Sequence, residues 1–155
     1  MKLRLVIVML LVTFQGAYSQ QQTVIAKFII QTAARNHVDV SQQYTTNKSY
    51  FVFYITADKE VNFGSIVPGT QQQSYGAISN LTHTSIAETP TQYATDTFDF
   101  SWAYSNTYDN HQGTANVHVV KIDKPGGIEF ILKIVPETLD LLEYKGYMEG
   151  SLKLD

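Results

Sequence analysis

The sequence predicts an all-β domain, built as an antiparallel β-sandwich of about eight short strands. Short runs of β-branched and aromatic residues recur along the chain, and turn signals separate them about every 8 to 15 residues. The last residues alternate between apolar and charged side chains, as in a strand with one face in water. A small closed β-barrel is the alternative, because short antiparallel strands at this spacing fit both architectures.

The first strands are expected in the N-terminal half of the chain. Residues 24–30 are rich in β-branched side chains, and residues 50–56 are all aromatic or β-branched, as strands favour. Residues 67–70 have Pro68 and Gly69 at their two central positions. They predict a type II turn, because Pro presets φ at the first position and Gly accepts a positive φ at the second.

The clearest hairpin joins residues 117–122 to residues 128–135, because the Pro-Gly pair at 125–126 repeats this turn chemistry. Farther along, five apolar residues share one face of an alternating run and predict a strand: Leu142, Tyr144, Met148, Leu152 and Leu154. The alternative for this region is a short helix over residues 136–145, closed by Gly146.

One segment carries a resemblance to a known family. Residues 63–69 read Phe-Gly-Ser-Ile-Val-Pro-Gly, and Ile78 and Asn80 follow. This segment resembles the F-G-x-V-x-x-G strand-turn of some immunoglobulin-like modules, with Ile66 where those modules usually have Val. The resemblance covers residues 63–80 alone and implies a sandwich fold, with no implication for function.

The N-terminus has the three parts of a secretory signal peptide. Lys2 and Arg4 form a short positive region, and residues 5–14 are an apolar run. Ala17 and Ser19 place small residues at the −3 and −1 positions of a cleavage site. The apolar run is too short to cross a bilayer core of ~30 Å as a helix.

These features predict a cleavable signal peptide at residues 1–19, cut after Ser19, and a single β-rich domain at residues 20–155. The expected location is outside the cytoplasm, either periplasmic or secreted, without stable membrane insertion. The alternatives are an uncleaved anchor and a buried first strand.

Charge and cysteine content narrow the range of partners. The chain has 11 basic and 14 acidic residues, and loss of Lys2 and Arg4 with the signal peptide changes the net charge from −3 to −5. No cluster of basic residues remains, which argues against a nucleic-acid partner. The chain has no cysteine, so it forms no disulfide and offers no thiol for catalysis.

An aromatic stripe occupies alternate positions of one expected strand: Phe98, Phe100, Trp102 and Tyr104. The favoured interpretation is a core stripe, because aromatic side chains bury large areas. The alternative is a platform for a sugar ring or a lipophilic ligand, because polar residues follow in the next loop. Under that alternative the candidate ligand-binding residues are Trp102, Tyr104, Asn106, Tyr108 and Asp109.

Motifs for catalysis or metal binding are missing from the sequence. No G-x-S-x-G motif occurs, and Asp109 lies in no D-x-D-x-D spacing. None of the four histidines has the close spacing of a metal site: His37, His83, His111 and His118. We therefore expect no catalytic residue, no metal site and no cofactor.

The leading hypothesis is an exported, non-enzymatic β-domain that binds a small ligand or a partner protein, with the oligomeric state left open. One alternative is a structural, assembly or surface-adhesion protein that acts through exposed strand edges. The other is a small hydrolase whose active site is assembled from residues distant in the sequence.

Overall fold

A computed structural model of the chain describes residues 22–152 and residue 154. The predicted signal peptide and its cleavage site lie outside these residues. The elements, in chain order, are β1 (Thr23–Arg35), β2 (Val38–Asp39), α2 (Ser41–Thr45), β3 (Tyr50–Ile55), β4 (Val61–Ile66), β5 (Gln73–Ile86), β6 (Thr95–Asn106), β7 (Gln112–Lys124), β8 (Gly127–Pro136) and β9 (Leu142–Gly150).

The strands form one antiparallel sheet that closes on itself. From β3 to β9 each strand pairs with its neighbour in the chain, β1 pairs with β3, and β9 pairs back with β1. This closure makes an eight-stranded barrel, with the two-residue β2 attached to the end of β1. The prediction of an antiparallel all-β fold is confirmed, and of its two architectures the structure has the closed barrel rather than the favoured sandwich.

The sandwich fold implied by the immunoglobulin-like resemblance is therefore wrong for this chain. Residues 63–66 lie on β4, which pairs with β3 and β5 inside the single barrel sheet. The turn after β4 does follow the predicted chemistry, because Gly69 has a φ of 75°. A strand-turn of this kind fits either architecture, so it could not distinguish them.

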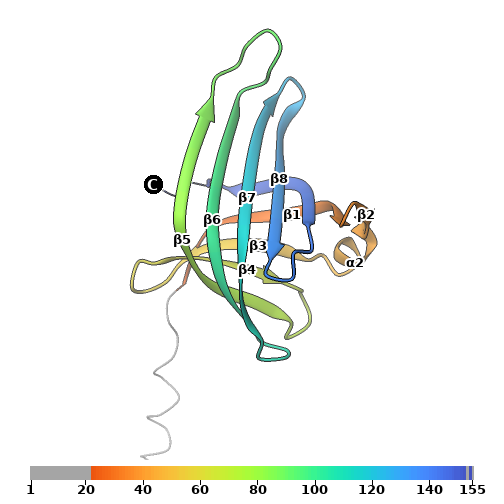
Figure 1. Cartoon of the computed structure of the whole chain (residues 1–155), viewed down its shortest axis with the longest axis vertical. Helices are drawn as coiled ribbons and strands as arrows, with labels where there is room; N and C mark the ends of the chain where they lie inside the picture. The colour runs from red at the N-terminus through yellow and green to blue at the C-terminus, as the bar shows by residue number, and fades with distance from the viewer. Residues whose placement is uncertain (1–21, 153, 155) are drawn as a thin grey trace, which may run out of the picture.

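The barrel is uneven in height. In Figure 1, β5 to β8 stand side by side as a tall sheet, and β1, β3 and β4 cross behind them. β5 takes part in both groups, because it pairs with β4 over its first residues and with β6 along most of its length. At Gly76 its backbone lies so close to β6 that a Cβ atom would be only 1.8 Å from the carbonyl oxygen of Ala103. Glycine permits this close approach of two backbones.

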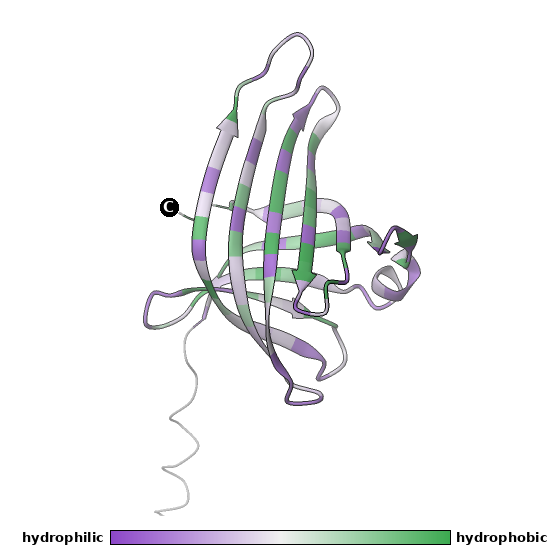
Figure 2. Ribbon diagram, in the orientation of Figure 1, coloured by the Kyte–Doolittle hydropathy of each residue, from purple (hydrophilic) through white to green (hydrophobic). Residues whose placement is uncertain are grey.

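The barrel interior is a packed core of aromatic and aliphatic side chains. Phe51 and Phe63 stack with their ring centroids 5.4 Å apart, and Trp102 meets Phe63 edge-on at 5.0 Å. An eight-stranded barrel is just wide enough for side chains to fill it. Along β7 the hydropathy alternates as this packing requires (Figure 2).

The predicted β7–β8 hairpin is confirmed, with Lys124 paired to Gly127. The positive φ of 130° falls on Gly127 and not on Gly126, so this turn differs from the type II turn expected there. The C-terminal strand is also confirmed, and Tyr144 of β9 is buried inside the barrel. The helix alternative is wrong, because β9 completes the sheet between β8 and β1.

No helix among the described residues is long and apolar enough to span a membrane.

Candidate functional site

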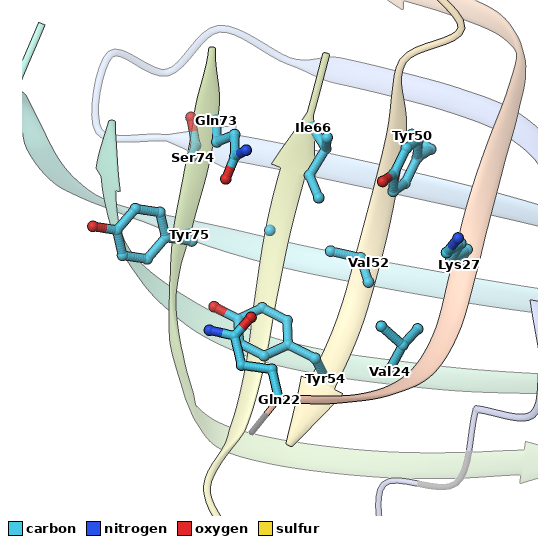
Figure 3. Close-up of a pocket in the computed structure, with 11 residues that line it drawn as sticks. Gln22, Val24, Lys27, Tyr50, Val52, Tyr54, Ile66, Gln73, Ser74 and Tyr75 are labelled. Carbon is cyan, nitrogen blue, oxygen red and sulfur yellow. The ribbon is translucent and has the colours of Figure 1, made fainter. Parts of the chain in front are cut away.

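A groove lies on the outer face of β1, β3, β4 and β5 and has a volume of about 320 Å³ (Figure 3). Its walls combine aromatic, aliphatic and polar side chains. The lining residues are Gln22, Val24, Lys27, Tyr50, Val52, Tyr54, Gly64, Ile66, Gln73, Ser74 and Tyr75.

One cross-strand row forms the floor of this groove. Lys27 pairs with Val52, Val52 pairs with Gly64, and Gly64 pairs with Tyr75. Cross-strand partners point to the same side of a sheet, so the row has a cation at one end and a ring at the other. Figure 3 shows Lys27 and Tyr75 on opposite sides of the groove with Val52 between them. Because Gly64 has no side chain, the middle of the row is hollow.

The apolar part of the groove comes from the composition of β3. Its alternate residues Phe51 and Phe53 fill the barrel, while Val52 and Tyr54 point outward. These two outward side chains are nevertheless only 5% and 7% exposed. An outward strand position of a barrel ordinarily faces water, so this burial marks a locally concave surface.

Polar groups surround the apolar floor. Lys27 Nζ lies 5.3 Å from the centroid of the Tyr50 ring, a cation–π distance. Lys27 forms no ion pair among the described residues, although Glu149 of β9 is its cross-strand neighbour on the side away from the groove. Burial raises the pKa of Tyr54, so its hydroxyl stays a neutral donor and acceptor at physiological pH. The side-chain amides of Gln22 and Gln73 border the groove.

The five candidate ligand-binding residues predicted from the sequence lie in two environments, the barrel core and one end of the barrel. Trp102 is 4% exposed within the core, as the favoured core interpretation of the stripe expected. Its Nε1–H has no hydrogen-bond partner among the described residues. Tyr104, two residues farther along β6, is half-buried and lies over Gly113 of β7.

The other three candidates lie where β6 runs into its loop. Asn106 is buried and accepts a hydrogen bond of 2.6 Å from Ser74 Oγ. Asp109 accepts a hydrogen bond of 2.9 Å from the backbone N–H of His111, which is ordinary turn chemistry. Tyr108 is 58% exposed, and partial burial raises its pKa. The structure thus brings Tyr104, Asn106, Tyr108 and Asp109 to one end of the barrel but leaves Trp102 inside it.

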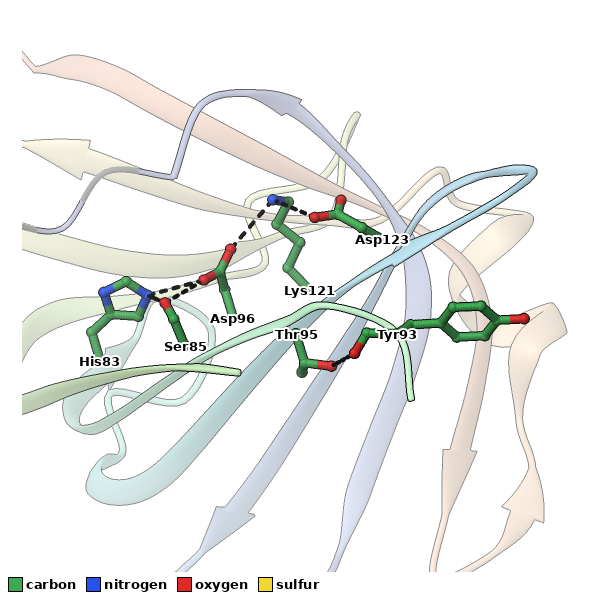
Figure 4. A network of polar contacts seen from close by, with 7 residues as sticks. All are labelled: His83, Ser85, Tyr93, Thr95, Asp96, Lys121 and Asp123. Carbon is green, nitrogen blue, oxygen red and sulfur yellow. Dashed lines mark hydrogen bonds and ion pairs between the residues drawn. The ribbon is translucent and has the colours of Figure 1, made fainter. Parts of the chain in front are cut away.

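Apart from the groove, a cluster of polar side chains connects β5, β6 and β7 (Figure 4). Ser85 Oγ donates a hydrogen bond of 2.6 Å to Asp96, and Lys121 Nζ lies 3.3 Å from both Asp96 and Asp123. The hydrogen bond from Ser85 and the contact with Lys121 lower the pKa of Asp96. His83 Nε2 lies 3.2 Å from Ser85 Oγ and 3.5 Å from Asp96.

This cluster contains Ser, His and Asp, but they do not form a catalytic triad. In a triad the imidazole lies between the hydroxyl and the carboxylate and removes the hydroxyl proton. Here Ser85 donates directly to Asp96, a carboxylate whose low pKa makes it a weak base. The His83 ring is stacked on Phe98 with a centroid distance of 4.3 Å. These contacts connect side chains of β5, β6 and β7. Their arrangement does not support the hydrolase alternative.

Among residues 22–152 and 154, no three His, Cys, Asp or Glu side chains gather in a way that could hold a metal ion.

Sequence reasoning missed the groove, although two signals for it are present. Residues 50–55 are apolar or aromatic at every position, so both faces of that strand carry rings or branched side chains. Gly64 stands within the neighbouring strand, where glycine leaves a gap among larger side chains. The register that sets Gly64 between Val52 and Tyr75 is a property of the folded sheet.

The fold and the groove define the class of the protein: an eight-stranded antiparallel barrel with a filled interior and a ligand-sized groove outside. Comparison of the chain with protein-family models, with curated proteins and with solved structures found no match.

Proposed function

We propose that this protein is a non-enzymatic binding protein that holds one sugar ring of a glycan in the outer groove. The observation that carries the proposal is the row from Lys27 through Val52 and Gly64 to Tyr75. At Gly64 the row has no side chain, and a cation and an aromatic ring stand on the two sides of this position.

A pyranose ring matches these walls in both chemistry and size. Its C–H faces pack on aromatic rings, and Tyr75, which is 46% exposed, supplies such a ring. Its hydroxyl groups need hydrogen-bond partners, and the amides of Gln22 and Gln73 supply them at the border. A volume of about 320 Å³ is at the small end of the range for ligand pockets. Lys27 further favours a sugar that carries a carboxylate.

The predicted signal peptide supports a site of action outside the cytoplasm, where glycans of cell surfaces and of the surroundings are accessible.

The experiment is a titration of the protein with neutral monosaccharides and with uronic acids, followed by NMR chemical-shift changes. We expect shifts at groove residues with at least one uronic acid, and at least a tenfold loss of affinity in Tyr75→Ala. Tyr147→Ala is the matched control, because Tyr147 on β9 is 43% exposed and Tyr75 is 46% exposed. Absence of saturable shifts with every sugar, or equal losses in both variants, would contradict the proposal.

A further inference from the structure

One edge of β5 is unpaired over much of its length. β4 pairs with β5 from Gln73 to Ala77, whereas β6 pairs with β5 as far as Ile86. From Ile78 onward, the edge of β5 that faces away from β6 has no strand partner among the described residues. Figure 1 shows this part of β5 at the margin of the tall sheet.

The last part of this edge lacks the features that usually prevent strand addition. Residues 82–86 read Thr-His-Thr-Ser-Ile, without Lys, Pro or any acidic residue, and all five are exposed. The irregularity in pairing lies between Ser79 and Thr82, where Asn80 has a φ of 54°. Natural edge strands are normally protected by lysine, proline, bulges or a cover. Residues 82–86, which we call the β5 edge, therefore have backbone N–H and C=O groups available to pair with another strand.

We propose that the β5 edge is a homodimer interface, occupied by the same edge of a second copy in antiparallel pairing about a two-fold axis at Thr84. This inference is independent of the sugar groove. The axis places Thr84 opposite Thr84 of the second copy and Thr82 opposite Ile86. β-Branched pairs of this kind stabilise antiparallel strands. Interfaces in which the same patch serves both copies are the commonest in oligomers.

The β5 edge also carries no Asp, Glu, Lys or Arg that would repel a second copy. Under this axis His83 lies opposite Ser85, and no two charges of the same sign meet. Both side chains already contact Asp96 within their own copy. Strand addition uses backbone groups, so it leaves these contacts in place.

The interface is small, which determines the kind of dimer to expect. A pair of five-residue strands buries less than the ~1,200 Å² of stable interfaces. We therefore expect a reversible dimer whose population rises with protein concentration.

The first test uses single cysteines, because the chain contains none of its own. Directly opposed residues of antiparallel strands have Cα atoms about 4.5 to 5.5 Å apart, within reach of a disulfide. Under mild oxidation Thr84→Cys should give a covalent dimer. The matched control is Thr97→Cys, because Thr97 pairs with Thr84 on β6, which has strands on both sides. Thr97→Cys should stay monomeric, and equal linking in both variants would overturn the proposal.

The second test reverses charges at the axis. Thr84→Lys and Thr84→Glu each place like charges opposite one another, so each should weaken the dimer at least tenfold in sedimentation equilibrium. An equimolar mixture of the two should restore association, whereas Thr97→Lys should behave like the unchanged protein. An unchanged protein that is monomeric at about 1 mM, or a mixture that fails to associate, would overturn the proposal.

Discussion

The aromatic residues of β6 and the outward residues of β3 lie in opposite environments, although both sets alternate along a strand. Phe98, Phe100 and Trp102 of β6 point into the barrel and are buried by the other strands. Val52 and Tyr54 of β3 point out of the barrel and are buried by their neighbours on the surface. The first set fills the core, and the second forms the wall of a groove.

This difference shows why one row of side chains fills the core while the other leaves a groove on the surface. Inside the barrel the rings pack directly against one another. Phe63, for example, contacts Phe51 on one side and Trp102 on the other. Outside it, Gly64 has no side chain, so the row is low between Val52 and Tyr75, and this low part lines the groove. The aromatic stripe of β6 therefore stabilises the fold, while the row through Gly64 lines the groove in which we propose that a sugar binds.

The largest expected effect is on the free energy of unfolding, and it compares an aromatic residue of the core with an aromatic residue of the groove. Trp102→Ala should lower the free energy of unfolding by about 3–5 kcal/mol, because it leaves a large cavity in the core. Tyr75→Ala should cost no more than about 1 kcal/mol, because its side chain is nearly half exposed. Urea unfolding measures the free energy of unfolding of both variants. Similar losses of stability would contradict the assignment of the two residues to different environments.

The next effect contrasts two glycines of the same barrel. Gly76→Ala should destabilise the protein by about 3 kcal/mol, because its Cβ would meet the backbone oxygen of Ala103 at 1.8 Å. Gly64→Ala should cost about 1 kcal/mol, because its nearest atom, the backbone oxygen of Ser74, is 3.0 Å away. The Gly64 methyl group should also reduce sugar binding by filling the floor. Thermal unfolding ranks the variants, and a milder effect at Gly76 than at Gly64 would contradict this assignment.

The third prediction concerns stability at alkaline pH, because its effect is absent at neutral pH and develops only above pH 10. Burial raises the pKa of Tyr144 inside the barrel and of Tyr54 in the groove above the usual 10.0. Above pH 10 the unfolded chain therefore loses these protons first, so stability falls as the pH rises. Tyr144→Phe and Tyr54→Phe should each lessen this fall, by up to about 1.4 kcal/mol per pH unit.

The measurement is urea unfolding between pH 9 and pH 12, with the exposed Tyr147→Phe as control. The larger change is expected in Tyr144→Phe, because burial is the first cause of the shift at both sites and is greater there. The same pH dependence in all three variants would show that Tyr54 is as accessible to water as Tyr147.

Much of the local structure could be predicted from the residues. The Pro-Gly pair at 125–126 and the flanking apolar runs predicted the β7–β8 hairpin, because turn residues and hydrophobic alternation act over a few positions. The helix α2 was not predicted, because five residues of mixed composition carry no recognisable period. For the aromatic stripe, alternation showed that the rings share one face but could not show which face lies inside.

The sequence by itself determined where most strands and the β7–β8 hairpin lie, because strand and turn signals depend on side chains within a few residues of one another. The absence of thiol chemistry follows from the composition alone. The tertiary structure alone decided the closure of β9 onto β1, the burial of Trp102 and the row that joins Lys27, Val52, Gly64 and Tyr75. The physical reason is that register and closure arise from pairings between distant strands. A shift of one residue in such a pairing would exchange the two faces of a strand, and with them the core and the site.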